Sequence, residues 1–279
     1  PKVLAWCRAV DDGPFSSISA GERIAFNYLY GFTLCTAAAA LTDRVRIGFN
    51  VIVAPWHAPA LLAKELASID VLSGGRLDVG VGVGGREQDF RALGVPFTDR
   101  LGRLDAVVDE LQRLWSGGAA VDGATVGPFP VQPGGPPLLC SGTGPKSLAR
   151  GARWAAGITG FALSADPAEA GATFRLAEQA WADAGRADRP RLGSGSFVAL
   201  GPDAEARLGH FARRYLDVFG TGVAAWLTDR MPLFTEDALH TFLVGLAAEG
   251  CDEVTLVPAD SDPDQVRRIA AVVAEVAAG

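Results

Sequence analysis

Segments with the pattern of β-strands alternate with segments with the pattern of helices along almost the whole chain, and this alternation limits the fold most. Each predicted strand is a run of apolar and β-branched residues, and each is followed by a helical segment with apolar side chains every three or four residues. Such alternation is typical of parallel strands joined by helical crossovers. The predicted strands cover residues 15–20, 44–53, 76–83, 137–140, 156–161, 191–200 and 253–257.

The number of predicted strands points to a barrel with one strand unaccounted for. A closed (β/α)8 barrel needs eight strands, whereas the sequence predicts seven and begins with a helical segment. Since position 1 is Pro and not Met, we expect a first strand to precede the numbered residues; otherwise the barrel is incomplete. We therefore expect an α/β protein with a (β/α)8 TIM barrel in one domain over residues 1–279. A Gly- and Pro-rich excursion at about 117–137 is predicted to form at most a small hairpin.

The predicted helices have clear start signals and apolar stripes. Asp166 and Asp262 each stand before a Pro and are predicted N-caps. A long helix is expected after Arg86, with its buried stripe at Leu101, Leu104, Val108, Leu111 and Trp115. The run at 44–53 is apolar almost throughout, which is typical of a strand buried on both faces. Further helices are predicted at about 28–41, 58–72, 203–219 and 236–248.

Composition excludes several classes of function. With 279 residues, of which 49% are hydrophobic, the chain can bury a large core. A net charge of −7 gives no electrostatic footprint for nucleic acid or for an anionic membrane. No run of 18 apolar residues occurs and the first 13 residues lack a signal-peptide pattern, so we expect a soluble, cytoplasmic protein.

The cysteines and histidines are too scattered for a metal site. Four cysteines lie far apart in apolar surroundings, and only three histidines could join them as ligands. We therefore expect buried, reduced thiols and no bound metal. These residues are Cys7, Cys35, Cys140, Cys251, His57, His210 and His240.

Glycine occupies every second position of the predicted strand at 76–83 and leaves one side of it nearly bare. Another backbone or a flat ligand could therefore lie close against it. The spacing Gly80-x-Gly82-x-x-Gly85 also matches a dinucleotide fingerprint. In that fingerprint, however, the glycines form the turn after the first strand, whereas Gly80 and Gly82 fall inside a later one. An NAD-linked Rossmann dehydrogenase is therefore disfavoured.

The turn at 141–146, Ser-Gly-Thr-Gly-Pro-Lys, lies between a predicted strand and a predicted helix. Free amides and the positive end of a helix dipole would make it a phosphate cradle, with the Ser141 and Thr143 hydroxyls and Lys146 as further donors. The alternative is a tight connection in which glycine only supplies the backbone angles. The residues alone leave both interpretations open.

Three charged or titratable residues follow predicted strands at the end where a barrel places its active site. Glu22 and Arg23 are predicted either to form a surface ion pair with one another or to face a ligand. His57 follows Trp56 in a loop, where an ordinary exposed or half-packed histidine is the favoured interpretation and a proton carrier the alternative. No Ser-His-Asp or Cys-His arrangement is suggested. This pattern favours cofactor chemistry, in which the protein mainly binds and orients.

Two segments resemble a known family. Residues 46–115 resemble the central signature of the bacterial luciferase-like monooxygenases, and residues 136–157 resemble the second one, with Ile-Ser-Ala-Gly-Glu-Arg before them. The resemblance implies a (β/α)8 barrel that uses reduced FMN, or the deazaflavin F420, and that assembles as a homodimer.

The resemblance also implies roles for individual residues. Asn50 and Val51 fall where the family often has a non-prolyl cis peptide beneath the isoalloxazine ring, and Gly82 would lie near that ring. The phosphate-binding turn is implied to comprise Ser141, Gly142, Thr143 and Gly144, with Lys146 as an additional donor.

Two positions depart from the family's pattern. Many relatives carry a histidine where this chain has Glu22-Arg23, and light-emitting relatives carry a phosphate-binding arginine near Val83. Arg86 or Lys146 could compensate for the latter. These departures argue against light emission itself.

The sequence thus predicts a flavin- or F420-dependent oxidoreductase or monooxygenase that acts on a small organic substrate, and it does not decide between the two cofactors. Its expected partners are that substrate, a separate flavin or F420 reductase and a second copy of the chain. The alternative is a flavin-binding protein without turnover, with an incomplete barrel.

Overall fold

The structure is a computed structural model that describes residues 2–278. The chain divides into two compact units. The first, which we call the β1–β6 unit, comprises Ser16–Ser141 with Trp154–Ala156. The second, the β7–β9 unit, comprises the residues up to Phe15, Gly142–Arg153 and the chain from Gly157 onward. The expected single domain over residues 1–279 stays a prediction, and its end positions, 1 and 279, lie outside the described residues.

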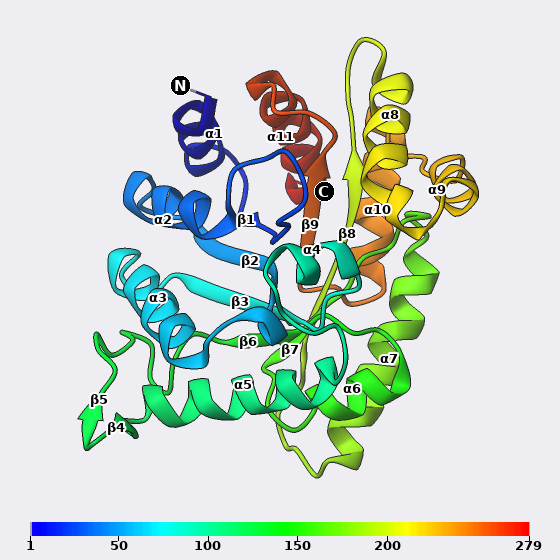
Figure 1. The fold of residues 1–279 in the computed structure, drawn as a ribbon. Helices are drawn as coiled ribbons and strands as arrows, with labels where there is room; N and C mark the ends of the chain where they lie inside the picture. The colour runs from blue at the N-terminus through cyan, green and yellow to red at the C-terminus, as the bar shows by residue number, and fades with distance from the viewer. Residues whose placement is uncertain (1, 279) are drawn as a thin grey trace. The chain divides into compact units, whose positions relative to one another are not determined.

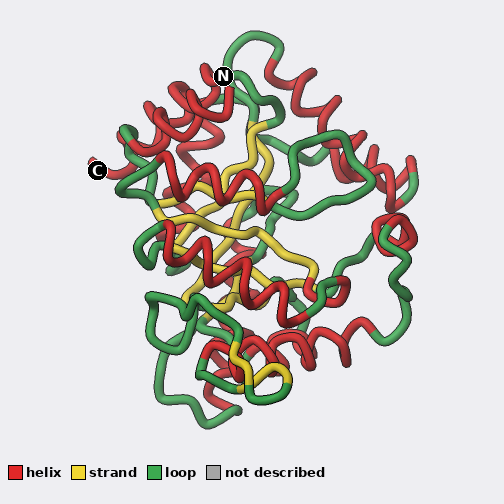
Figure 2. Tube along the Cα trace, turned by 60° about the vertical axis from the view of Figure 1, so that its left-hand side comes forward, coloured by secondary structure: helices red, strands yellow, loops and turns green. Residues whose placement is uncertain are grey.

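The β1–β6 unit is built on four parallel strands in the order β1-β2-β3-β6 (Figure 1). Helix α2 packs against α3, and α3 packs against α5. The strands are β1 Ser17–Ala20, β2 Arg46–Val53, β3 Leu77–Gly82 and β6 Leu138–Cys140, and the helices are α2 Gly31–Leu41, η1 Ala54–Trp56, α3 Pro59–Leu72, α4 Glu87–Ala92 and α5 Arg100–Trp115. The predicted small hairpin is confirmed: β4 Ala119–Val121 pairs antiparallel with β5 Ala124–Thr125 (Figure 2).

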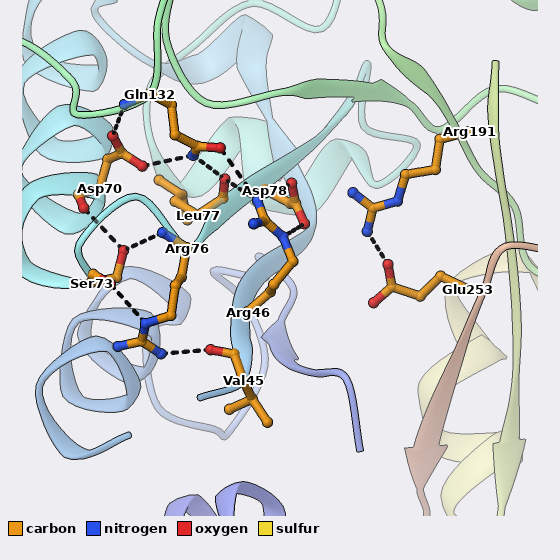
Figure 3. A network of polar contacts seen from close by, with 10 residues as sticks. All are labelled: Val45, Arg46, Asp70, Ser73, Arg76, Leu77, Asp78, Gln132, Arg191 and Glu253. Carbon is orange, nitrogen blue, oxygen red and sulfur yellow. Dashed lines mark hydrogen bonds and ion pairs between the residues drawn. The ribbon is translucent and has the colours of Figure 1, made fainter. Parts of the chain in front are cut away.

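The β7–β9 unit contains three parallel strands. The predicted helix starts are confirmed, because the Ala168 N–H donates to Asp166 (2.9 Å) and the Asp264 N–H donates to Asp262 (3.0 Å). Arg191 and Glu253 form an ion pair across two neighbouring strands (Figure 3). The elements are α1 Lys2–Asp11, α6 Pro145–Gly151, β7 Gly157–Thr159, α7 Pro167–Asp183, β8 Arg191–Val198, α8 Ala204–Leu216, η2 Asp217–Phe219, α9 Thr221–Thr228, α10 Glu236–Ala248, β9 Glu253–Pro258 and α11 Pro263–Ala278.

All seven predicted parallel strands are confirmed, but three details differ. The long helix after Arg86 is two helices, because Gly94 in a left-handed conformation (φ +68°) and Pro96 interrupt it between α4 and α5. Leu101, placed in the buried stripe of α5, is 48% exposed, whereas the rest of the stripe is buried. Helix α9 was not predicted.

Strand β2 is not buried on both faces, as its apolar run suggested. Ile47, Phe49 and Ile52 are buried, whereas Arg46 and Asn50 are only partly covered. Arg46 points its guanidinium at Asp78 of β3, and the pairing register with β3 shifts between Phe49 and Ile52. The second face of β2 therefore carries polar contacts and, near its end, an irregularity.

Arg76 fixes the end at which strands β2 and β3 begin (Figure 3). Its guanidinium donates to the carbonyl oxygens of Ser73 (2.7 Å), Thr42 (2.6 Å) and Ala39 (3.2 Å), and also to Val45. The last carbonyl groups of α2 have no hydrogen-bond partner within that helix, and Arg76 supplies a donor to them. The arginine of the Ser-Gly-Gly-Arg sequence is therefore structural.

Asp70 on α3 fixes the returning excursion at the same end of the sheet (Figure 3). Its carboxylate accepts from the Val131 N–H (2.7 Å), the Gln132 N–H (3.1 Å) and the Gln132 side chain (2.7 Å). Arg46 completes this network through Nε and Nη2 to Asp78 at 2.6 and 2.7 Å. The beginnings of the strands are therefore closed by charged hydrogen bonds.

Among the helices of residues 2–278, none has the length and apolarity to cross a membrane.

Candidate active site

The candidate site lies where strands β1, β2 and β3 end, because parallel strands bring their carboxyl ends to one edge of the sheet. Glu22 follows β1 by two residues, and its N–H donates to the carbonyl of Val51 on β2 (3.1 Å). Its side chain is completely buried. Oε2 accepts from the N–H of Val53 (2.7 Å). Glu22 is therefore held over the end of the neighbouring strand.

His57 pairs with Glu22. Its Nε2 lies 2.9 Å from Oε2 and 3.0 Å from Oε1, and the imidazole is only 11% exposed. The ring packs against Phe32, with the ring centroids 5.6 Å apart. This partial burial agrees with the half-packed histidine of the favoured expectation, and the role of a proton carrier stays a prediction. This histidine is nearly buried against a carboxylate, because η1 turns the chain back towards the loop that follows β1.

Arg23 does not pair with Glu22, so the predicted surface ion pair between them does not form. Arg23 Nε lies 3.0 Å from Oδ2 of Asp89 on α4, and both side chains are buried. Asp89 Oδ1 also accepts from the N–H groups of Ala25 (2.7 Å) and Ile24 (3.3 Å). Consecutive side chains of an extended segment project to opposite sides. Glu22 therefore faces the ends of the strands, whereas Arg23 faces α4.

Three further groups surround the Glu22–His57 pair. The Trp56 indole N–H donates to His57 Nε2 (3.0 Å). Tyr30, the residue before α2, lies near this pair, and burial, followed by the charges of Glu22 and Glu65, raises the pKa of Tyr30 well above its usual range. Burial also raises the pKa of Glu65 on α3, an effect that His57 opposes and Glu22 reinforces. The site thus gathers one imidazole, two carboxyl groups, a phenol and an indole.

Residues from three strand ends meet at Gly82. A Cβ atom at this position would lie 2.8 Å from Ser141 Oγ and 2.9 Å from Val51 Cγ2, so only glycine fits. The peptide between Asn50 and Val51 is cis, as the resemblance implied. The space that Gly82 leaves is lined by the side chains of Val51 and Ser141, and contact of a flat ligand with this strand face stays a prediction.

The turn that follows β6 is open. Thr143, Gly144 and Lys146 are exposed, and within residues 2–278 the backbone N–H groups of Gly142, Thr143 and Gly144 donate to no other group. A Cβ at Gly142 would overlap Ser147, whereas one at Gly144 would contact nothing. The tight-connection interpretation therefore explains Gly142 but not Gly144. Free amides, a hydroxyl and an ammonium group together provide the donors that a phosphate accepts.

The sequence did not single out Tyr30, Glu65 or Asp89. Asp89 is separated by 66 residues from Arg23, and Glu65 lies on the polar side of an ordinary helix. A usable signal was the alternation of side chains after β1, which prevents Glu22 and Arg23 from sharing one partner.

No cluster of three or more His, Cys, Asp and Glu residues that could hold a metal occurs within residues 2–278. All four cysteines are free thiols. Cys7, Cys35 and Cys140 are buried as expected, whereas Cys251 is only partly buried.

Comparisons with known proteins agree on one family. The model of a family described as luciferase-like monooxygenase matches residues 2–241. An uncharacterized protein of Mycobacterium tuberculosis is 34% identical over 134 residues, which cover 45% of this chain and 46% of the relative. The oxygenase component of a flavin-dependent trigonelline monooxygenase from Acinetobacter baylyi is 30% identical over 159 residues, covering 52% of this chain and 44% of the relative. The matched chain thus spans a little under half the length of these relatives.

A solved structure shows the fold. An F420-dependent secondary alcohol dehydrogenase, in complex with an F420-acetone adduct, superposes with a TM-score of 0.81 at 17% identity, over 98% of this chain and 94% of that chain. The predicted fold class, α/β with the luciferase-like (β/α)8 topology, is therefore confirmed. The expected additional first strand would precede residue 1 and lies outside the described residues.

Proposed function

Because the chain belongs to the luciferase-like monooxygenase family, we propose that it is an oxidoreductase that binds reduced FMN or F420 and acts on a small organic substrate. The observation that carries this proposal is the open turn at 141–146, whose free donors suit the phosphate of such a cofactor. The flavin-dependent relative and the F420-dependent structural neighbour support the two candidate cofactors.

The residues present fit this group of cofactors. We assign phosphate binding to the amides of Gly142, Thr143 and Gly144 and to the side chains of Ser141, Thr143 and Lys146. We assign contact with the ring to the segment Asn50–Val51 and to the strand end at Gly82. When bound, the cofactor would supply the electrons or the hydride, and the chain's own part is to bind, to orient and to hold a proton at Glu22 and His57.

A separate reductase and a homodimer are part of the proposal. The trigonelline relative is named as an oxygenase component, so we propose that the reduced cofactor reaches this chain from another enzyme. Leu61, Val71 and Leu72 are exposed apolar residues on α3, and they support assembly of two copies. Sedimentation at several protein concentrations tests the dimer. The expected cytoplasmic location stays a prediction.

Titration with FMN, riboflavin and F420 tests the proposal, with cofactor fluorescence as the readout. Riboflavin lacks the phosphate, so FMN is expected to bind at least about tenfold more tightly, equivalent to about 1.4 kcal/mol. The double variant Thr143→Val with Lys146→Gln is expected to reduce this advantage, since the backbone amides remain, and to leave riboflavin binding unchanged. Lys2→Gln, an exposed lysine on α1, is the control. Binding of neither FMN nor F420 would refute the proposal.

Turnover distinguishes an enzyme from the alternative, a flavin-binding protein. The departure from the histidine of many relatives at Glu22-Arg23, where Arg23 is held by Asp89, favours that alternative. Oxidation of the reduced cofactor is measured with and without candidate substrates. Acceleration by a substrate supports the oxidoreductase, whereas tight binding without acceleration for any of them supports the alternative.

A further inference from the structure

The Nε2 atom of His57 lies within hydrogen-bond distance of groups with opposite requirements. The Trp56 indole can only donate a hydrogen bond, so its contact at 3.0 Å requires a lone pair on Nε2. The Glu22 carboxylate at 2.9 Å requires a proton between the two residues. A proton on Nε2 satisfies Glu22 but not Trp56, whereas a proton on Glu22 allows both neighbours to donate to Nε2.

A further contact of Glu22 opposes the effect of Trp56. The Val53 N–H (2.7 Å) donates to Oε2 of Glu22 and so requires a lone pair on that oxygen. The indole favours the opposite state, with the proton on Glu22. These contacts therefore act in opposite directions on one proton.

The proton lies in a nearly closed environment. The Glu22 side chain is fully buried and the His57 side chain is nearly so. The shared proton is therefore shielded from solvent on the Glu22 side.

From this geometry we propose that Glu22 and His57 share one proton. The pair would then be the acid–base group of the site, a role that rests on the proposed function. In the donating direction, the shared proton leaves the pair for a substrate atom. A water molecule then returns a proton to the pair and leaves as hydroxide.

The charges around the pair are arranged for this role. Glu65 on α3 and Glu22 both lie near the imidazole of His57, and a carboxylate stabilises an imidazolium. Arg23, the nearest cation in the sequence, is held by Asp89 of α4 on the other side of the loop. Its positive charge is thereby compensated and does not compete for Glu22.

The position of the shared proton is measured by ¹⁵N NMR of histidine-labelled protein at pH 7, without cofactor. The chain has three histidines, and His57→Gln identifies the His57 signals. In the unaltered protein, the Nε2 shift is expected between the values of a protonated and an unprotonated nitrogen. Glu22→Gln should move it to the unprotonated value, and Trp56→Phe should move it to the protonated value. A shift at either limit that Trp56→Phe does not move would overturn the proposal.

Two internal controls make these outcomes decisive. His210 on α8 and His240 on α10 are exposed, and their unchanged signals show that the β7–β9 unit is unaltered in each variant. The NMR experiments need no cofactor, so they fail or succeed independently of the proposed function. If no cofactor binds but the proton is shared, only the proposed function is refuted. If a cofactor binds but the proton is not shared, only this inference is refuted.

Discussion

The loop that carries Glu22 depends on one buried carboxylate, and replacing Asp89 with alanine tests this dependence. Asp89 accepts hydrogen bonds from Arg23 Nε and from two backbone N–H groups of the loop. Both members of its ion pair are buried, at 8% and 0% exposure of their side chains. The Asp89→Ala variant would leave the guanidinium without its counter-charge and both amides without an acceptor.

The expected magnitude follows from the burial of this pair. Removing one partner of a buried ion pair typically costs about 3–5 kcal/mol, because the other charge stays buried without compensation. In a chain of this length, that corresponds to a melting temperature lower by about 6–10 °C, at about 2 °C per kcal/mol. Replacing both partners, in Asp89→Ala with Arg23→Met, should recover part of the loss, since the uncompensated charge is gone. The contact of Arg23 with the Phe26 ring, 4.8 Å from its centroid, is lost in that double variant.

Thermal denaturation measures the global effect, and hydrogen–deuterium exchange of residues 21–30 measures the local one. We expect faster exchange in this loop and a displaced His57 NMR signal in Asp89→Ala. The control is Glu110→Gln, which breaks the more exposed pair with Arg113 on α5 and should cost at most about 1 kcal/mol. If Asp89→Ala is no less stable than Glu110→Gln, or if the loop exchanges at the normal rate, the reasoning is wrong.

Three further predictions concern single side chains. Burial raises the pKa of Glu65 above its ordinary value of 4.5, so the folded protein keeps a proton that the unfolded chain loses, and this contribution to stability disappears as the pH rises. Glu65→Gln should therefore melt at a higher temperature than the unaltered protein at pH 8 and at the same temperature at pH 4; an equal difference at both pH values would contradict this. Gly82→Ala should weaken FMN binding at least about tenfold, because the new methyl group overlaps Val51 and Ser141, whereas Gly222→Ala on α9, with nothing within 4 Å, should not affect titrations. Arg76→Lys should lower the melting temperature by about 5 °C and leave FMN binding intact; weaker binding would show that the two ends of the strands are coupled.

The sequence predicted the strands and most helices because these depend on local periodicity and on start signals. The seven parallel strands and the Asp166 and Asp262 caps are of this kind. The break between α4 and α5 could also be predicted, since Gly94 and Pro96 both disfavour a helix. One helix was predicted across it because the apolar stripe of α5 follows directly.

The partners of the candidate site residues could not be predicted in the same way. The ion pair of Arg23 with Asp89 and the contact of His57 with Glu22 join residues 66 and 35 positions apart. Such contacts depend on how loops fold back over the strand ends, and periodicity carries no information about this. The open turn at 141–146 was predicted as one of two alternatives, and only its exposure and free amides favour the phosphate.

The two ends of strands β2 and β3 are held in different ways, and this difference has a practical consequence. At one end, Arg76 distributes its donors over several carbonyl groups of α2 and the start of β2, so no single loss frees it. At the other end, the first residues after β1 are tied to α4 through Asp89. Directed evolution towards new substrates should therefore begin in the loop after β1 and in α4, where the backbone can be reshaped while the opposite end keeps the strands in register.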